Sequence, residues 1–259
     1  MRTPELSIVI ACYQEAGHLE DSVRQLRETL DAFGRTYELL FIDDCSRDDT
    51  SAVIERLTDG RADCLFVRHA QNVGRGGTVS EGFRLARGRI VGFLDIDLEV
   101  HCRHIPDMVA AIERGHDGAT ALRHYRVGLS FGGFVRHALS QGYRWLFRGL
   151  FRLPYRDTET GFKFFVREKI LPVVERTRDR GWFWDTEIMV LAHQAGLRIA
   201  EVPCPFVRRS DKKSTVRVFR DTWRYLVALR AFRKRLRAAA RLPSHTSIGS
   251  PRTAPAAER

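Results

Sequence analysis

The sequence predicts an α/β fold built on a mainly parallel central sheet. Short apolar, β-branched runs alternate along the chain with segments of helical period, and we find no internal repeat. Parallel strands need a crossover between them, so this alternation indicates parallel pairing with right-handed helical crossovers. With 259 residues, 44% of them hydrophobic, the chain is long enough to bury one substantial core.

The elements follow one another in a regular order. Strands are predicted at Leu6 to Ala11, Tyr37 to Ile42, Leu65 to Val67 and Ile90 to Leu94. Helices are predicted over residues 18–33, 48–58, 76–87, 104–114 and 128–152, and from Val216 to Leu236. The first four strand and helix pairs form a Rossmann-like nucleotide-binding half. We expect a catalytic domain over 1–215, a basic amphipathic helix over 216–241 and a disordered tail over 242–259, which is rich in Ser, Pro, Thr and Ala.

The positive charge is confined to one segment. The net charge is +11, and residues 208–241 hold 13 Lys and Arg against 2 Asp and Glu, so the rest of the chain is balanced at 30 against 30. Such a segment suits an anionic membrane surface, a phosphorylated substrate or a nucleic acid. The five scattered cysteines, the lack of a signal peptide and the lack of about 18 consecutive apolar residues favour a cytoplasmic protein, peripheral on the inner face of the membrane.

An acidic cluster leaves the fourth predicted strand. Asp95, Asp97 and Glu99 stand at alternate positions directly after the apolar run Ile90 to Phe93. Carboxylates leaving a buried strand need neutralising partners, and a hard divalent cation that bridges a diphosphate would supply one. The alternative is a solvated exit from the strand, since an isolated D-x-D is common.

Polar clusters also follow two other predicted strands. They are Tyr13-Gln14-Glu15 and Asp43-Asp44. In open parallel sheets the ligand lies beyond the carboxyl ends of the strands. We therefore expect these clusters and the acidic cluster to line one cleft.

Five sequence blocks carry a family resemblance. They are SIVIACYQEAGHLE, YELLFIDDCSRDDT, NVGRGGTVSEGFRLARG, VGFLDIDLE and DTETGFKFFVRE. In this order, within a span from about Leu6 to about Trp223, the chain resembles family 2 glycosyltransferases of the dolichyl-phosphate mannose synthase and polyprenyl-phosphate glycosyltransferase type. The resemblance implies a GT-A fold and a metal-dependent, inverting transfer of a hexose from a GDP- or UDP-sugar to polyprenyl phosphate.

The resemblance also implies roles for individual residues. The nucleotide sugar is expected to contact Ala11, Tyr13, Glu15, Ile42, Asp44, Asp95, Ile96 and Asp97. Mg²⁺ or Mn²⁺ is expected on Asp95, Asp97 and Glu99, and phosphates on Arg123, Arg136, Arg208 or Arg209, and Lys213. Catalysis is expected to depend on Asp95, Asp97, Asp157, Arg123 and Arg136. Two positions and one short stretch depart from the family pattern: Ala11 replaces a proline, Cys45 replaces a glycine, and Val100-His101-Cys102 replaces a histidine-proline stretch.

Other candidates have a structural alternative beside the functional one. Arg75, in Gly74-Arg75-Gly76-Gly77-Thr78, is expected to meet the donor's diphosphate, although these glycines also suit the start of a helix. Asp44 is expected to bind base or ribose, whereas Asp43 could cap the following turn. Asp157 is expected to orient sugar hydroxyls, and its alternative is an ordinary turn.

The acceptor decides whether a catalytic base is needed. A phosphate monoester, with a second pKa of about 6, is already ionised and nucleophilic at neutral pH. A hydroxyl of a saccharide or small molecule would instead need a base such as Asp157 or Asp185. The basic segment favours polyprenyl phosphate. A nucleic-acid-binding arm would leave the acidic cleft unexplained, because carboxylates repel phosphodiesters, so no nucleic acid partner is expected.

Overall fold

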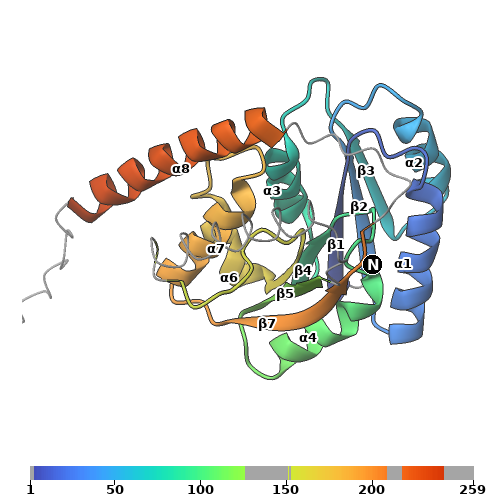
Figure 1. Ribbon diagram of the computed structural model, residues 1–259. Coiled ribbons are helices and arrows are strands. Elements are labelled where there is room, and N and C mark those ends of the chain that lie inside the picture. Colours follow the sequence, from blue (N-terminus) through green and yellow to red (C-terminus); the bar gives the residue numbers. More distant parts are fainter. Residues whose placement is uncertain (1–2, 126–150, 152, 209–217, 242–259) are drawn as a thin grey trace, which may run out of the picture. The chain divides into compact units, whose positions relative to one another are not determined.

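The structure, a computed structural model, describes residues 3–125, 151, 153–208 and 218–241 (Figure 1). The chain separates into two units, Met1–Val216 and Arg217–Arg259. The strands are β1 (Leu6–Cys12), β2 (Tyr37–Asp43), β3 (Cys64–Arg68), β4 (Ile90–Leu94), β5 (Gly118–Tyr125), β6 (Phe162–Val166) and β7 (Ile199–Phe206). The helices are α1 (Leu19–Phe33), α2 (Thr50–Thr58), α3 (Arg75–Leu85), a 3₁₀ turn (Cys102–His104), α4 (Ile105–Glu113), α6 (Arg167–Val174), α7 (Trp184–Gln194) and α8 (Val218–Arg241).

The central sheet of the first unit has seven strands in the order β3-β2-β1-β4-β6-β5-β7. β1 pairs in parallel with β2 and β4, and β2 pairs in parallel with β3, as the sequence predicted. β6 is antiparallel to both of its neighbours, β4 and β5. Because β1 lies between β2 and β4, the carboxyl ends of these three strands lie together at one edge.

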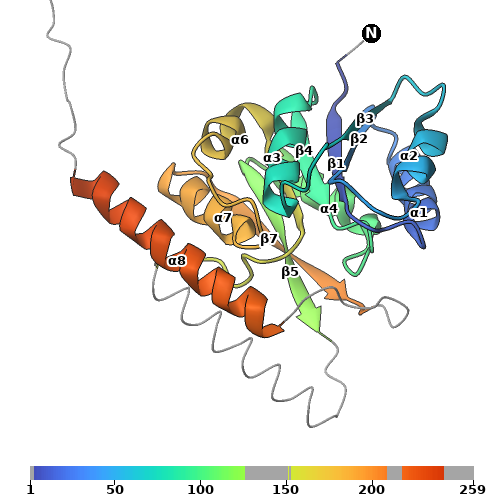
Figure 2. The ribbon, with the colours of Figure 1, turned by 90° about the horizontal axis from the view of Figure 1, so that it is seen from above.

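Helices cover both faces of this sheet (Figures 1 and 2). One face packs against α1, α2 and α4, and the other against α3, α6 and α7. The side chains of β1 alternate between the two faces: Ile8 and Ile10 join the core beneath α1, and Val9 faces α3. Because both faces of these strands are buried, their sequences are continuous apolar runs rather than alternating apolar and polar residues.

Both faces of the sheet are packed closely enough to require small residues. On the α3 face a Cβ at Gly82 would overlap Val9, and on the opposite face a Cβ at Gly92 in β4 would overlap the ring of Phe164. Beside them lies an aromatic cluster of Phe83, Phe93, Phe165 and Trp184, whose ring centroids are 5.6–6.2 Å apart. This packing fixes α3 and α7 to the sheet, and these helices carry site residues.

The second unit contains α8, which confirms the predicted C-terminal helix. Its 24 residues include eight Arg and Lys and a single acid, Asp221. None of the helices in the part of the chain that the structure describes is both long and apolar enough to cross a membrane. The predicted helix over 128–152 and the tail over 242–259 lie almost wholly or wholly outside the described residues.

Candidate active site

Backbone strain is concentrated at the three strand ends that were predicted to form the cleft. Gln14 after β1, Cys45 after β2 and Leu98 after β4 have φ values of 59°, 62° and 55°, and they are the non-glycine residues with positive φ in the described ranges. Side chains with a Cβ rarely adopt this conformation, and it tends to occur at functional sites. Cys45 occupies the position where the resemblance expects glycine, which would adopt this φ without strain.

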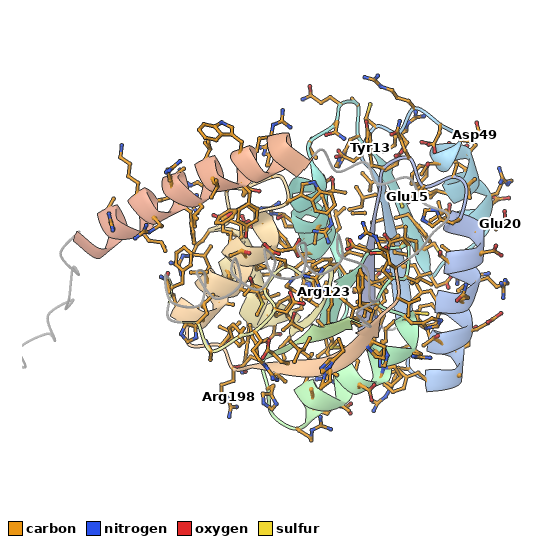
Figure 3. The ribbon with its side chains drawn as sticks, in the orientation of Figure 1. Tyr13, Glu15, Glu20, Asp49, Arg123 and Arg198 are labelled. Carbon is orange, nitrogen blue, oxygen red and sulfur yellow. The ribbon has the colours of Figure 1, made fainter. Side chains whose placement is uncertain are left out.

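The end of β1 carries the first predicted nucleotide contacts. Ala11 is the register partner of Ile42 in β2, so the two residues expected at the nucleotide lie side by side on one face of the sheet. Tyr13 is 40% exposed, and it lies with Glu15 beyond the end of the strands (Figure 3). The Glu15 carboxylate is 2.8 Å from Nε2 of His18. Tyr13 therefore offers an accessible ring, while Glu15 is held within its loop.

The two aspartates after β2 differ in role. Asp43 is fully buried and accepts hydrogen bonds from the Ser46 N–H, at 3.0 Å, and from the Ser51 hydroxyl. This is the capping role that the sequence allowed for Asp43. Asp44 accepts the N–H groups of Val73, at 2.7 Å, and Gly74, at 2.8 Å. Asp44 thus holds the loop that leads into α3, in addition to the nucleotide contact predicted for it.

His69 links this loop to α3. Its Nδ1 lies 2.8 Å from Asp44 and its Nε2 lies 2.8 Å from Glu81, with 8% of the side chain exposed. Burial lowers the pKa of His69, but hydrogen bonds to the two carboxylates outweigh burial and raise the pKa above the ordinary 6.5. His69 and Glu81 were not predicted from the sequence, because His69 lies outside the five blocks and the block that contains Glu81 assigns it no role.

The acidic cluster after β4 is ordered by a tight turn. The Asp95 N–H donates to the Gly161 carbonyl at 2.8 Å, and the Leu98 N–H donates to the Asp95 carbonyl at 3.1 Å. The Glu99 N–H donates to the Asp97 carboxylate at 3.3 Å. Ile96, between the two aspartates, is buried. The turn places Asp95 and Asp97 at the edge where β1 and β2 also end.

These acids do not form a closed protein cage for a metal. Within the described ranges, no three His, Cys, Asp or Glu side chains are placed together to hold an ion. Mg²⁺ in phosphate-transfer sites is commonly held by one or two carboxylates, with substrate phosphates and water completing the coordination. The acids present fit a cation bound in this way, together with a diphosphate.

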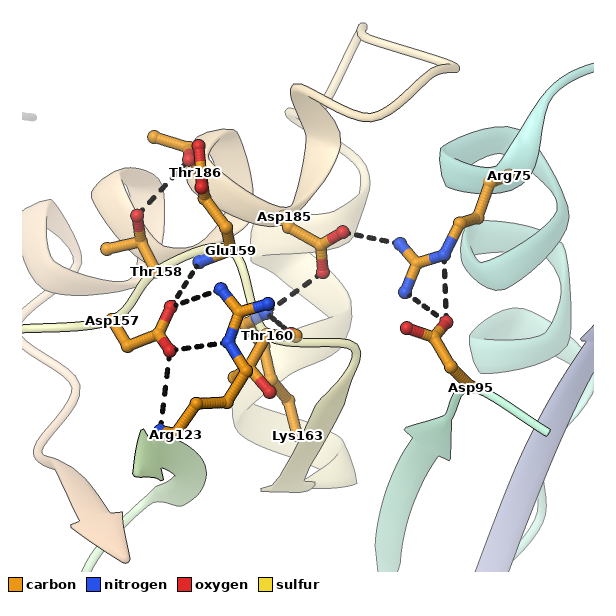
Figure 4. A network of polar contacts seen from close by, with 10 residues as sticks. All are labelled: Arg75, Asp95, Arg123, Asp157, Thr158, Glu159, Thr160, Lys163, Asp185 and Thr186. Atoms are coloured by element: carbon orange, nitrogen blue, oxygen red, sulfur yellow. Dashed lines mark hydrogen bonds and ion pairs between the residues drawn. The ribbon is translucent and has the colours of Figure 1, made fainter. Parts of the chain in front are cut away.

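Arg75 connects the acidic cluster to α7 (Figure 4). Its Nε and Nη2 donate to Oδ1 of Asp95, at 3.0 and 2.7 Å, and its Nη1 donates to Asp185. The guanidinium carbon lies over the rings of Phe93 and Trp182, 5.3 and 5.2 Å from their centroids. The structure therefore brings Arg75 to the predicted metal edge, at the first position of α3.

Lys163 completes a row of alternating charges. It is fully buried, and its ammonium donates to Asp185 at 2.9 Å and to the Thr160 carbonyl. Burial lowers the pKa of Lys163, and Asp185 opposes this shift. The sequence suggested Asp185 as a possible base but did not single out Lys163, because a lysine in a strand is ordinarily exposed.

Asp157 forms a buried ion pair with Arg123. The carboxylate is fully buried and accepts Nε and Nη2 of Arg123 at 2.7 and 2.9 Å, a bidentate pair. The Asp157 N–H donates to Glu201 at 3.0 Å. Asp157 and Arg123, predicted separately, thus form one unit, in which Asp157 orients an arginine.

Glu159 is the residue whose chemistry the sequence did not reveal. It lies in the segment between Asp157 and Lys163 (Figure 4). Burial raises the pKa of Glu159 to about 7; Arg123 and Lys163 oppose the rise, and Asp157 and Asp185 add to it. The one signal in the sequence that could have indicated Glu159 was its place two residues after Asp157, a predicted site residue. Its protonation near neutral pH depends on burial, which the sequence does not show.

The remaining predicted arginines and lysine fall within or next to segments that the structure does not describe. Arg136, Arg209 and Lys213 lie outside the described residues. Arg208 is exposed just after β7.

Comparison with known proteins identifies the family. The model of Glycosyl transferase family 2 matches residues 7–171, more than half of the chain. This chain belongs to glycosyl transferase family 2. The family membership predicted from the five sequence blocks is confirmed.

Two similar proteins are named as glycosyltransferases, and the name of the second specifies dolichyl phosphate. The chain is 34% identical to glycosyltransferase AglD of Haloferax volcanii over 215 residues, which cover 81% of this chain and 34% of that protein. It is 27% identical to dolichyl-phosphate beta-glucosyltransferase of Saccharomyces cerevisiae over 221 residues, covering 76% and 65% of the two chains. The chain thus spans about a third of the first relative and about two thirds of the second.

Solved structures confirm the GT-A fold expected for the family. Mannosyl-3-phosphoglycerate synthase from Rubrobacter xylanophilus superposes with a TM-score of 0.67 at 16% identity, over 96% of this chain and 79% of that one. Glucosyl-3-phosphoglycerate synthase from Mycobacterium tuberculosis superposes with a TM-score of 0.60 at 19% identity, over 82% and 72%. At these low sequence identities, the structural similarity supports a shared fold and nothing further.

Replacing Cys45 by the glycine typical of the family is expected to stabilise the chain. Cys45→Gly removes the cost of a left-handed residue with a Cβ, about 1–2 kcal/mol, and part of this gain is offset by the larger entropy of glycine in the unfolded chain. We expect an increase of up to about 1 kcal/mol in the free energy of unfolding, measured by urea denaturation. Cys64→Gly, in β3, is the control and is expected to destabilise. A loss of stability in Cys45→Gly would contradict the strain argument.

The pKa of Glu159 predicts a pH-dependent stability. Between pH 4.5, its ordinary value, and about 7 the folded chain binds the Glu159 proton more tightly than the unfolded chain, so this group makes stability fall as pH rises. The free energy of unfolding of Glu159→Gln, minus that of the wild type, is expected to grow across this window and to level off above it. Urea denaturation at a series of pH values measures the difference, with Glu168→Gln, exposed in α6, as the control. A difference that stays constant from pH 4.5 to 8 would refute the assignment.

Proposed function

We propose that this chain transfers a hexose, with inversion, from a GDP- or UDP-sugar to polyprenyl phosphate. Family membership supports sugar transfer. The named activities of the yeast relative and of the undecaprenyl-phosphate 4-deoxy-4-formamido-L-arabinose transferase of Shewanella sediminis, 32% identical over 122 residues, support a lipid-phosphate acceptor. That match covers 47% of this chain and 37% of the Shewanella protein.

The donor is proposed to bind at the edge formed by β1, β2 and β4. Ala11, Tyr13 and Ile42 would contact the nucleoside. Mg²⁺ or Mn²⁺, both present in solved structures of the Mycobacterium enzyme with UDP, would be held by Asp95, Asp97 and Glu99. Bound there, the cation would stabilise the negative charge that develops on the leaving diphosphate.

The observation that carries the choice of acceptor is the pairing of both predicted bases. Asp157 is bound by Arg123, and Asp185 lies between Arg75 and Lys163. A carboxylate that neutralises a buried cation accepts a proton only by leaving that cation uncompensated, which is costly. A phosphate acceptor needs no base, and Arg123, 18% exposed, would orient it. The pairing therefore favours phosphate over a hydroxyl.

One observation favours the alternative, a hydroxyl acceptor. Glu159 has a pKa of about 7, which is well suited to a general base at neutral pH. The two acceptor classes therefore differ in whether they require Glu159. A hydroxyl acceptor would need its carboxylate, and a phosphate acceptor would not.

The domain organisation is proposed to match this function. Residues 1–215 would form the catalytic domain and 216–241 a basic amphipathic helix that binds anionic headgroups on the inner face of the membrane. Each Lys or Arg near such a surface contributes on the order of 1 kcal/mol. Arg123, Arg136, Arg208 or Arg209, and Lys213 would face phosphates of donor or acceptor.

An acceptor screen tests the proposal. Purified chain with Mn²⁺ or Mg²⁺ and a panel of GDP- and UDP-sugars is expected to label polyprenyl phosphate and not saccharide or small alcohol acceptors. Asp97→Asn is expected to reduce turnover at least about 100-fold, because it weakens stabilisation of the leaving group. Asp59→Asn, exposed after α2, is the control.

Glu159→Gln separates the two acceptor classes in the same screen. With polyprenyl phosphate the variant is expected to keep its rate within a few-fold. A loss of about 100-fold or more, the usual contribution of a general base, together with labelling of a hydroxyl acceptor by the wild type, would replace the lipid-phosphate proposal by the alternative.

Membrane binding is tested with vesicles. The chain is expected to sediment with phosphatidylglycerol vesicles at low salt and less so at high salt, because the attraction is electrostatic and screened. Phosphatidylcholine vesicles are the control. Equal sedimentation with both lipids, or with neither, would contradict a role for the basic helix at an anionic surface.

A further inference from the structure

The positive charge beside Asp95 is supplied by the chain itself. Two nitrogens of Arg75 converge on a single oxygen, Oδ1 of Asp95, and the third reaches Asp185. The Arg75 side chain is 13% exposed and that of Asp185 is 3% exposed, whereas Asp95 is 45% exposed. Solvent therefore reaches the carboxylate of Asp95 but hardly reaches the guanidinium that neutralises it.

Arg75 is held in place from several sides. Its guanidinium makes cation–π contacts with the rings of Phe93 and Trp182. The preceding residues Val73 and Gly74 donate to Asp44. This degree of support distinguishes the Arg75 contact from a surface ion pair, which would contribute little and exchange freely.

The second oxygen of Asp95 is confined too. A Cβ at position 161 would overlap Oδ2 of Asp95 and would crowd Nη2 of Arg75. Glycine at this position thus permits the close approach of three groups: the Asp95 carboxylate, the Arg75 guanidinium and the backbone at Gly161. A cation that approaches Asp95 meets a carboxylate whose charge is already compensated, and meets the repulsion of the guanidinium as well.

We propose that Arg75 is the resident counter-ion of Asp95 and releases it to a divalent cation only when a nucleoside diphosphate arrives to receive the guanidinium. This inference rests on the proposed function. The planar fork of arginine binds phosphate oxygens in the same two-point geometry with which it binds carboxylates. The phosphate oxygens would thus replace the Asp95 carboxylate as the partners of Arg75, and Asp95 would then be available to bind the cation.

This exchange makes cation and nucleotide binding cooperative. If the diphosphate removes Arg75 from Asp95, then nucleotide tightens cation binding, and by linkage the cation tightens nucleotide binding by the same factor. Asp185 sets the strength of the exchange, because it competes with Asp95 for Arg75 while it also neutralises the buried Lys163. The chain would therefore load metal together with donor, and bind it weakly alone.

The experiment measures Mn²⁺ binding by electron paramagnetic resonance, with and without UDP or GDP. The wild type is expected to bind Mn²⁺ about tenfold or more tightly when the nucleotide is present. In Arg75→Gln the affinity for Mn²⁺ alone is expected to rise about tenfold, and the gain from nucleotide to shrink by a similar factor. Arg84→Gln is the matched control, because Arg84 lies on the same helix, is 46% exposed and pairs with Glu175. It is expected to leave both quantities unchanged.

A second variant predicts a change of opposite sign. Asp185→Asn removes the competing carboxylate, so Arg75 is expected to hold Asp95 more firmly and the affinity for Mn²⁺ alone to fall several-fold. Circular dichroism and urea denaturation check that each variant is folded. If Arg75→Gln does not fold, the fall in Asp185→Asn still decides the question, and an unchanged or raised affinity there overturns the inference.

The outcomes separate this inference from the function on which it rests. If the wild type binds neither UDP nor GDP in the presence of Mn²⁺, the proposed donor chemistry and the counter-ion exchange both fail. If the wild type binds the nucleotide with Mn²⁺, but folded Arg75→Gln binds Mn²⁺ alone no more tightly than the wild type, the donor chemistry stands and the exchange is overturned.

Discussion

The need to neutralise buried charge governs the architecture of this site. Asp157, Lys163 and Asp185 lie almost wholly out of solvent, and each has an oppositely charged partner. Removing one partner of such a pair typically costs about 3–5 kcal/mol, because it leaves an uncompensated charge. These buried side chains are thus bound to one another in a fixed pattern, and that pattern limits which of them can take part in chemistry.

The fold supplies the frame for this pattern. β1, β2 and β4 end at one edge, and the chain leaves each of them through a left-handed residue that turns the next polar side chain into place. The tight packing of α3 against β1, made possible by Gly82, fixes the helix on which Arg75 stands. Strain at the strand ends is therefore balanced by close packing beneath them.

The proposed donor and acceptor sides of the site are physically continuous. Asp95 belongs to the proposed donor edge, and Lys163 follows the segment that contains Asp157; Arg75 and Asp185 join them in one row of alternating charges. A change in charge at one end of this row alters the electrostatic energy of the groups at the other end, because the contacts between them are short and the surrounding dielectric is low. The site is better described as one electrostatic unit than as a metal motif with separate acceptor residues.

Much of this protein could be predicted from its sequence. The four strands from Leu6 to Leu94 and the helices between them follow from hydrophobic period, which is a local property. The meeting of the clusters near Tyr13, Asp44 and Asp95 at one edge follows from parallel pairing. Family membership followed from five blocks in a set order.

Only the tertiary structure decided which charged groups pair. Arg75 and Asp185 are 110 residues apart, Arg123 and Asp157 are 34 apart, and Lys163 and Asp185 are 22 apart. No local pattern encodes such contacts, just as none placed β6 antiparallel between β4 and β5. The sequence determined which residues could carry charge at the site. Burial and distance, which exist only in the folded chain, decided which of those charges are already neutralised and which remain available to a substrate.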